Sequence, residues 1–225
     1  MSTRLSDYYG LPLLKPPVWT WEIPAYFFVG GAAGAAAVVG AVARVAGANP
    51  ALVRDARWLA EVGGAVSPAL LVSDLGRPER FLNMLRVFKL RSPMSVGAWT
   101  LVAFSNAAGA SAFANALTKT SHGRLPIKIV ADAAEVLSAA TGLVLSTYTG
   151  VLIGATAVPV WSRSVSLLPI HFGAAGLAAA VSILELRGHR DRALNVLGIG
   201  AAAVETAIGI ALETDDDPAL DPIKY

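Results

Sequence analysis

The sequence predicts an all-α integral membrane protein, built as a bundle of about six transmembrane helices with short loops. The chain has 225 residues, of which 55% are hydrophobic and only 15% are charged. A soluble domain of ordinary composition carries about 25% charged residues. This hydrophobic share leaves more apolar surface than one soluble core of this length can bury, so lipid is the expected solvent.

Six segments are candidate spanning helices, because a helix needs about 20 mostly apolar residues to cross a bilayer. The second segment is the weakest, since it is short and contains Glu61. Glycine pairs such as Gly30 and Gly34 are typical of close helix packing in lipid. The six segments are residues 23–45, 58–75, 95–117, 127–153, 167–186 and 194–212.

The linkers hold the turn residues and most of the prolines, and none is long enough for a separate domain. We expect an interfacial arm at residues 1–22, a transmembrane domain at 23–212 and an acidic tail at 213–225. Trp19 and Trp21 of the arm suit an aromatic belt at the membrane surface. An even number of spans puts both termini on one face, here called face A, opposite face B. The 18 basic residues divide equally between the two faces, so the positive-inside rule leaves the orientation open.

The composition also restricts the cofactors that this chain can hold. It contains no cysteine, which excludes an iron–sulfur cluster or a zinc ion held by its own thiolates. Of three histidines only His171 lies inside a candidate helix, whereas a haem between membrane helices usually needs two axial ligands. We therefore expect no haem and no metal in this chain. The net charge of +2 gives no basic field for nucleic acid.

Three of the acidic residues inside candidate helices are candidates for proton chemistry. Asp132 and Glu135 share a face of the fourth segment, and Glu205 lies near the middle of the sixth. Ionisable groups inside a membrane are costly, so these acids are candidates for a proton path or a polar cavity wall. The alternative is structural: Asp132 pairs with Lys128 one turn earlier, and Glu205 makes a protonated or hydrogen-bonded packing contact.

Polar residues from four candidate helices converge on face A by topology alone. A quinone head group needs hydrogen-bond donors and proton-exchanging groups at the interface, above an apolar cleft. A belt tyrosine, a packing histidine and ordinary loop charges are the structural alternatives for the individual residues. The converging set is Tyr148, Glu22, His171, Asp74, Arg77 and Arg80.

Several short motifs lie in the first four candidate helices and in the loop between the second and the third. Residues 74–81 read DLGRPERF, residues 92–95 read SPMS, and residues 97–99 read GAW. Residues 21–34 (WEIPAYFFVGGAAG) and 148–150 (YTG) lie in the first and fourth candidate helices. Together these motifs resemble the NrfD/PsrC family, the polysulfide-reductase-like membrane subunits of multi-subunit respiratory oxidoreductases.

The resemblance implies a site for a non-covalent quinone, either menaquinone or ubiquinone. It also implies a ferredoxin-like partner that carries [4Fe–4S] clusters, with a molybdopterin-type catalytic subunit beyond it. The family's helix-four tyrosine corresponds to Tyr148. Its polar residues at the start of helix one fall near Glu22, although a histidine and an asparagine of some members have no clear match here. Members commonly have eight or more spanning helices, so another chain could complete this bundle.

We therefore expect a membrane anchor subunit that exchanges electrons between the quinone pool and an iron–sulfur partner. It would be a multi-pass protein of a prokaryotic cytoplasmic membrane. The loop that carries Arg80, Arg86, Lys89 and Arg91 would dock the partner. One alternative is a purely structural anchor without its own quinone site. The other is a small proton-coupled transporter that uses the three intramembrane acids, although we see no internal repeat that would favour transport.

Overall fold

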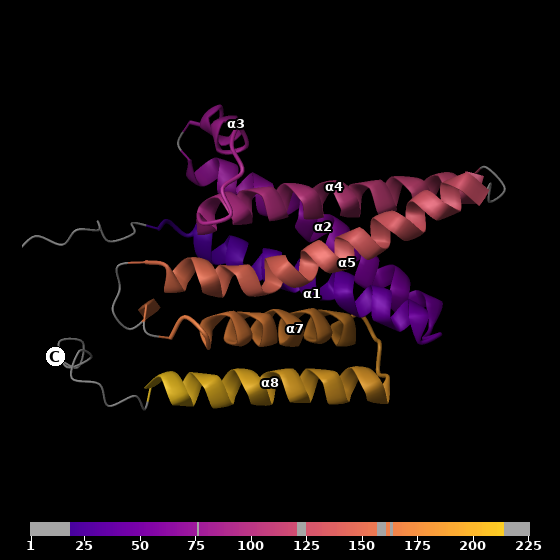
Figure 1. The fold of residues 1–225 in the computed structure, drawn as a ribbon. Coiled ribbons are helices and arrows are strands. Elements are labelled where there is room, and N and C mark those ends of the chain that lie inside the picture. The colour runs from indigo at the N-terminus through magenta and orange to yellow at the C-terminus, as the bar shows by residue number, and fades with distance from the viewer. Residues whose placement is uncertain (1–18, 76, 121–124, 157–160, 163, 214–225) are drawn as a thin grey trace, which may run out of the picture.

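The computed structural model describes residues 19–75, 77–120, 125–156, 161–162 and 164–213, which form an all-helical bundle (Figure 1). The expected all-α fold is confirmed over this part of the chain. Most of the expected arm and tail, residues 1–18 and 214–225, lie outside the described residues. The helices are α1 (Glu22–Val45), α2 (Pro50–Asp74), α3 (Arg80–Met84), α4 (Pro93–Thr120), α5 (Leu125–Gly154), α7 (Leu168–Leu186) and α8 (Arg192–Glu213).

The second long helix begins at Pro50 instead of residue 58, so the expected start was wrong. Asn49 precedes the helix, and its side-chain oxygen accepts a hydrogen bond of 2.9 Å from the Ala51 amide. This is an N-cap, and proline is favoured at the next position because it needs no amide donor there. The charges of Asp55 and Arg57 resemble a loop in sequence. In the structure both residues lie in helical turns and bind partners on neighbouring helices.

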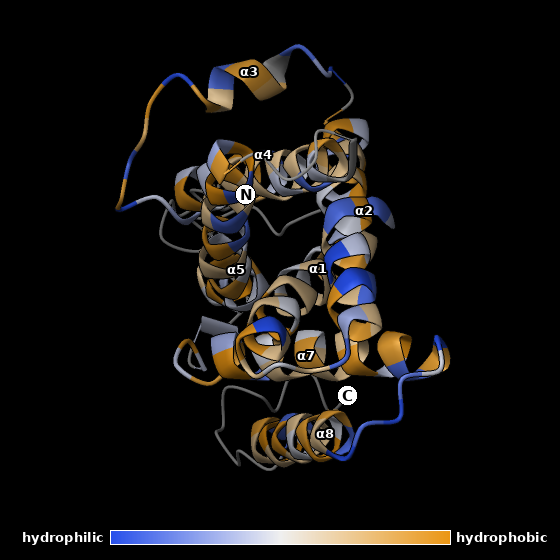
Figure 2. Ribbon diagram, turned by 90° about the vertical axis from the view of Figure 1, so that its right-hand side faces the viewer, coloured by the Kyte–Doolittle hydropathy of each residue, from blue (hydrophilic) through white to orange (hydrophobic). Residues whose placement is uncertain are grey.

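Six helices of the described structure are long, and among the described residues four of these meet the requirements of length and apolar composition for a membrane span. These four are α1, α5, α7 and α8. Helix α2 is diluted by charged residues in its first half, and α4 by serine, threonine and asparagine. Hydrophilic residues are visible along α2 in Figure 2, whereas α8 is largely apolar. Four of the six expected spans are therefore candidates by length and composition, and a bundle of six spanning helices stays a prediction.

Helix α1 occupies the centre of the bundle and packs against α2, α5 and α7. Helix α4 covers α2 and α5, while α8 packs mainly against α7 (Figures 1 and 2). The start of α1 and the end of α8 lie at the same end of the bundle, which we identify with face A (Figure 1). Helix α8 is the most peripheral, and Leu194 and Ala201 are its buried residues.

Glycine allows the central helices to approach backbone to backbone. A Cβ atom on Gly34 of α1 would overlap the backbone carbonyl of Gly142 in α5. A Cβ on Gly142 would lie 2.7 Å from the Gly34 carbonyl oxygen, which no side chain tolerates. Where α1 crosses α7, a Cβ on Gly176 would lie 2.9 Å from the backbone of Gly31. Small residues at these crossings are the expected means of helix association in lipid.

Helix α2 contains a proline in its interior, Pro68. Proline has no amide hydrogen, so the carbonyl one turn earlier, that of Gly64, loses its helical donor. The hydroxyl of Ser105 on α4 donates to this carbonyl at 2.6 Å. An interhelical bond therefore replaces the lost intrahelical one and joins α2 to α4.

Candidate functional site

Two of the sequence motifs build the face A end of the bundle. The DLGRPERF segment ends α2 at Asp74 and leads into the short helix α3. The SPMS segment begins α4, and the Ser95 hydroxyl fixes the turn before it. That hydroxyl accepts from the Lys89 amide at 3.0 Å and donates to the Val87 carbonyl at 3.2 Å. The first turn of α4 is thereby tied to the loop that precedes it.

A cavity of about 120 Å³ lies between these segments, bounded by α1, α2, α3, α4 and α5. Its walls are mainly apolar, with two tyrosines, Tyr26 and Tyr148, and one carboxylate, Asp74. The carboxylate accepts a hydrogen bond from the Thr20 hydroxyl, which ties the entry to α1 to the end of α2. The apolar walls include Leu71, Phe81, Met84, Met94 and Leu152.

The phenol of Tyr148 is buried, with 6% of the residue exposed. Its hydroxyl donates to the Pro93 carbonyl oxygen at 2.6 Å. Gly97, the glycine of the GAW motif, lies directly beneath the ring, and a Cβ there would overlap it. The glycine is needed because the start of α4 passes across the face of the ring. The SPMS and GAW motifs together seat this tyrosine.

Of the six residues expected to converge at face A, the structure brings Tyr148 and Asp74 to one cavity. Glu22 is half-buried at the start of α1, and its Oε2 has no hydrogen-bond partner among the described residues. Arg77 is exposed in the loop after α2. Neither residue lines the cavity, and neither does His171.

His171 lies at the start of α7, behind a row of aromatic rings. The Tyr26 ring contacts Phe27, Phe27 contacts Phe172, and Phe172 contacts His171, with centroids 5.8, 6.0 and 5.9 Å apart. Two phenylalanine rings therefore stand between this histidine and the cavity tyrosine. The Nδ1 atom of His171 is buried without a partner in the described part of the chain.

Sequence reasoning missed Tyr26, which is 2% exposed and lines the cavity opposite Tyr148. A signal was present in the sequence: Tyr26 follows Glu22 by one helical turn, so the two share a face of the first helix.

The acids of α5 lie in an ionic cluster near face B. Glu135 is 5% exposed and pairs with Arg57 of α2 at 2.7 Å and with Arg44 of α1 at 3.2 Å. Asp132 also pairs with Arg44, so the expected local pairing with Lys128 is replaced by a contact between helices. The Nε of Arg57 and the Oε1 of Glu135 are buried without a partner in the described structure.

A second charged cluster ties the start of α2 to the end of α7, also near face B. Asp55 accepts from Arg187 at 3.0 Å and lies 3.0 Å from the Nε2 of His189. Gly188, with φ of +97°, ends α7 in a turn that returns the His189 amide to the Leu184 carbonyl. The Arg187 guanidinium also lies over the Trp58 ring, 5.0 Å from its centroid.

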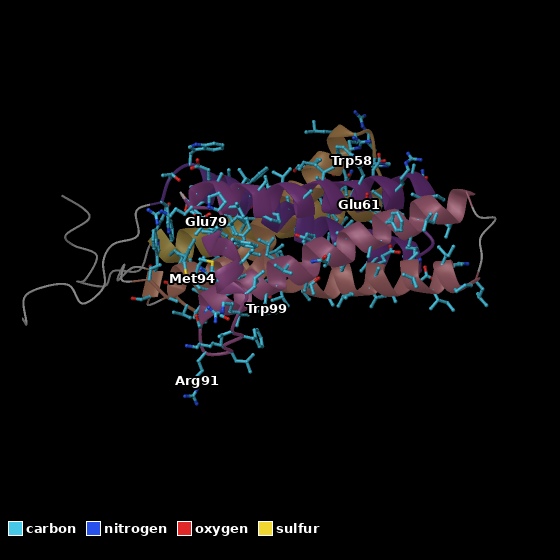
Figure 3. The ribbon with its side chains drawn as sticks, turned by 90° about the horizontal axis from the view of Figure 1, so that it is seen from above. Trp58, Glu61, Glu79, Arg91, Met94 and Trp99 are labelled. Carbon is cyan, nitrogen blue, oxygen red and sulfur yellow. The ribbon has the colours of Figure 1, made fainter. Side chains whose placement is uncertain are left out.

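Glu205 is half-buried on α8, which packs mainly against α7. The ionic cluster of Glu135 lies between α1, α2 and α5, so the structure does not bring Glu205 to it. Among the expected docking residues, Arg86, Lys89 and Arg91 are exposed between α3 and α4. In Figure 3 the side chain of Arg91 points away from the bundle. The side chain of Arg80 lies outside the described structure.

Comparison with protein families gives one match. The family described as polysulphide reductase, NrfD, matches residues 12–190, which include every helix from α1 to α7. A comparison with curated proteins finds no match. The matched region carries the DLGRPERF, SPMS and GAW motifs that build the Tyr148 cavity. The chain thus belongs to the NrfD family of polysulphide reductases, and so is a multi-pass membrane subunit of the kind that anchors respiratory oxidoreductases.

Proposed function

We propose that the cavity of Tyr148 binds the head group of a quinone, through which this subunit exchanges electrons with an iron–sulfur partner. The supporting observation is the make-up of the cavity: two phenols and one carboxylate in otherwise apolar walls, at the end of a membrane bundle. A ligand with an apolar ring and polar carbonyl edges matches those walls. The partner would be a ferredoxin-like [4Fe–4S] protein, with a molybdopterin-type catalytic subunit beyond it.

The cavity has the size of a single ring. An engineered protein cavity of about 150 Å³ accommodates one benzene molecule, and the cavity here measures about 120 Å³. An isoprenoid tail would therefore lie outside it, along the apolar surface of the helices. When bound, a quinone would accept two electrons and two protons, or release them as a quinol.

The side chains of the cavity can each perform a defined task. The hydroxyls of Tyr26 and Tyr148 can hold carbonyl oxygens, and Tyr148 would turn its proton from the Pro93 carbonyl to do so. Asp74 can exchange protons with the face A side, because it lies where α2 ends. Leu71, Phe81 and Met94 exclude water from the ring.

Quinone binding by the full chain in lipid nanodiscs tests this proposal. Binding of a short-tailed quinone is followed by quenching of tryptophan fluorescence. Replacing both cavity tyrosines, Tyr26→Phe and Tyr148→Phe, should weaken binding and leave the helical content unchanged. Thr147→Val is the matched control, because Thr147 is next in sequence but bonds only to carbonyls of its own helix. If the double tyrosine variant binds quinone as tightly as Thr147→Val and the parent, the cavity is not the quinone site and the structural-anchor alternative is favoured.

A proton path through Asp132, Glu135 and Glu205 stays a prediction. The ion pairs of Glu135 with Arg57 and of Asp132 with Arg44 support a structural role for the two acids of α5. The separation of Glu205 from these acids gives no support to a shared path.

A further inference from the structure

The segment between α2 and α4 stands apart from the bundle. We call residues 77–92 the side loop; it contains α3. In Figure 1 the side loop lies beside the face A ends of α2 and α4, and does not extend beyond them. Figure 2, viewed along the helices, shows α3 displaced sideways from α4. If the helices cross a bilayer, a segment in this position lies over lipid at the level of the membrane surface.

The side loop exposes large apolar side chains. Leu82 is 68% exposed, Val87 57%, Phe88 53% and Leu90 79%. The Phe88 ring contacts the ring of Trp99 on α4, with centroids 6.1 Å apart, so the apolar surface continues onto that helix. Water is an unfavourable solvent for a contiguous surface of this kind.

Cations alternate with these apolar residues along the side loop. The segment contains five basic residues and one acid, Glu79. Arg86, Lys89 and Arg91 are exposed and flank the apolar positions. Long cationic side chains can lay their methylene stems on apolar surface and extend their charges outward to phosphate. Basic segments next to a membrane helix are attracted to anionic lipid.

We propose that the side loop is a membrane-surface element that lies in the headgroup layer of an anionic bilayer. Its apolar side chains enter the acyl boundary, and its cations bind lipid phosphates. The sequence led us to expect that these cations dock a partner protein. The sideways position favours lipid instead, because a segment that lies beside the helices and does not extend beyond their ends presents its apolar residues to the surface of the bilayer. This inference does not depend on quinone binding.

The side loop also forms part of the wall of the Tyr148 cavity, through Phe81 and Met84. The depth of the side loop in the lipid would therefore set the position of that wall. An amphipathic ligand that reaches the cavity from the bilayer would pass this element.

The chain contains no cysteine, so single cysteines can be introduced and spin-labelled without background. Leu90→Cys reports on the side loop in the full chain, reconstituted in nanodiscs that contain anionic phospholipid. Ile199→Cys, on the exposed apolar face of α8, is the lipid-facing reference, and Arg190→Cys, in the turn before α8, is the water-facing reference. Collision with oxygen and with a water-soluble nickel complex measures the depth of each label.

The label at position 90 should collide more often with oxygen than with the nickel complex, as the label at position 199 should. The label at position 190 should collide more often with the nickel complex. Replacing Arg86, Lys89 and Arg91 together with glutamine should shift the label toward water in anionic nanodiscs. The same replacement should shift it less in neutral nanodiscs. Nickel collisions at position 90 equal to those at position 190 would place the loop in water and overturn the proposal in favour of a soluble partner. A shift of equal size in both lipids would overturn the role of lipid charge.

Discussion

The hydroxyl of Tyr148 donates a hydrogen bond of 2.6 Å to the Pro93 carbonyl oxygen, joining α5 to the first residue of α4. This one bond connects two motifs that are far apart in the sequence, YTG and SPMS. It also orients the phenol toward the cavity that Tyr26 and Asp74 share. The position of the proposed quinone site therefore depends on a contact between two helices.

Removing this hydroxyl should affect quinone chemistry more than it affects the fold. Tyr148→Phe keeps the ring that rests on Gly97 and deletes only the donor. A neutral hydrogen bond contributes about 0.5–1.5 kcal/mol, so quinone affinity should fall roughly 2- to 13-fold. Quinone-linked turnover of the assembled complex should fall, and turnover with an artificial dye at the catalytic subunit should not. Unchanged rates in both assays would leave Tyr148 as a packing residue.

A substitution at Gly97 tests how the Tyr148 ring packs against α4. Gly97→Ala places a methyl group where the ring lies, and overpacking of this kind costs about 1–3 kcal/mol. Gly109→Ala on the same helix is the control, because no atom lies within 4 Å of the added methyl group. Alanine favours helix by about 1 kcal/mol over glycine, so the control should be neutral or more stable. Thermal unfolding in detergent compares the two, and equal melting temperatures would contradict the packing described.

The two acids of α5 should differ in their effect on stability. Glu135→Gln removes a buried charge that faces half-buried Arg57, and breaking a buried ion pair typically costs about 3–5 kcal/mol, which is an upper bound here. The side chains of Asp132 and Arg44 are both 39% exposed, so Asp132→Asn should cost about 1 kcal/mol or less. Unfolding in denaturant measures both losses. Lost quinone-linked turnover with unchanged stability in Glu135→Gln would instead support a proton path.

A double-mutant cycle can isolate the bond between Ser105 and the Gly64 carbonyl. Ser105→Ala should cost about 0.6 kcal/mol, the average for hydrogen bonds between membrane helices, and at most about 1.7 kcal/mol. Pro68→Ala restores an amide donor within α2 for the same carbonyl, so in that background Ser105→Ala should cost little. The same loss in both backgrounds would show that the proline does not create the need for this serine. The measurement is the free energy of unfolding of the four variants.

Apolar runs were enough to predict α1, α5, α7 and α8, because lipid requires a spanning segment to be apolar along most of its length. The start of α2 was missed because Asp55 and Arg57 look like loop residues until their partners on α7 and α5 are known. The same limit applies to Asp132. In sequence its nearest cation is Lys128, but the crossing of α1 and α5 brings Arg44 closer.

The candidate site was predictable only in part, for a related reason. Motif and topology together pointed to Tyr148 and Asp74, which the cavity does combine. Topology also grouped His171 with them. The order of the helices gives the membrane face on which a residue lies, but not its position within the plane of the membrane. The rings of Phe27 and Phe172 separate this histidine from Tyr26, and such packing follows from the arrangement of α1 and α7.

The contact between Gly34 and Gly142 bears on the insulation of the membrane. Gly142 follows Glu135 by roughly 10 Å of helix and precedes Tyr148 by roughly 9 Å, at 1.5 Å per residue. The polar positions of α5 on either side of it are therefore interrupted by two backbones in contact, with no room for a chain of water molecules. Along the seam of α1 and α5, a file of water molecules between the ionic cluster of Glu135 and the cavity of Tyr148 would be broken at this contact.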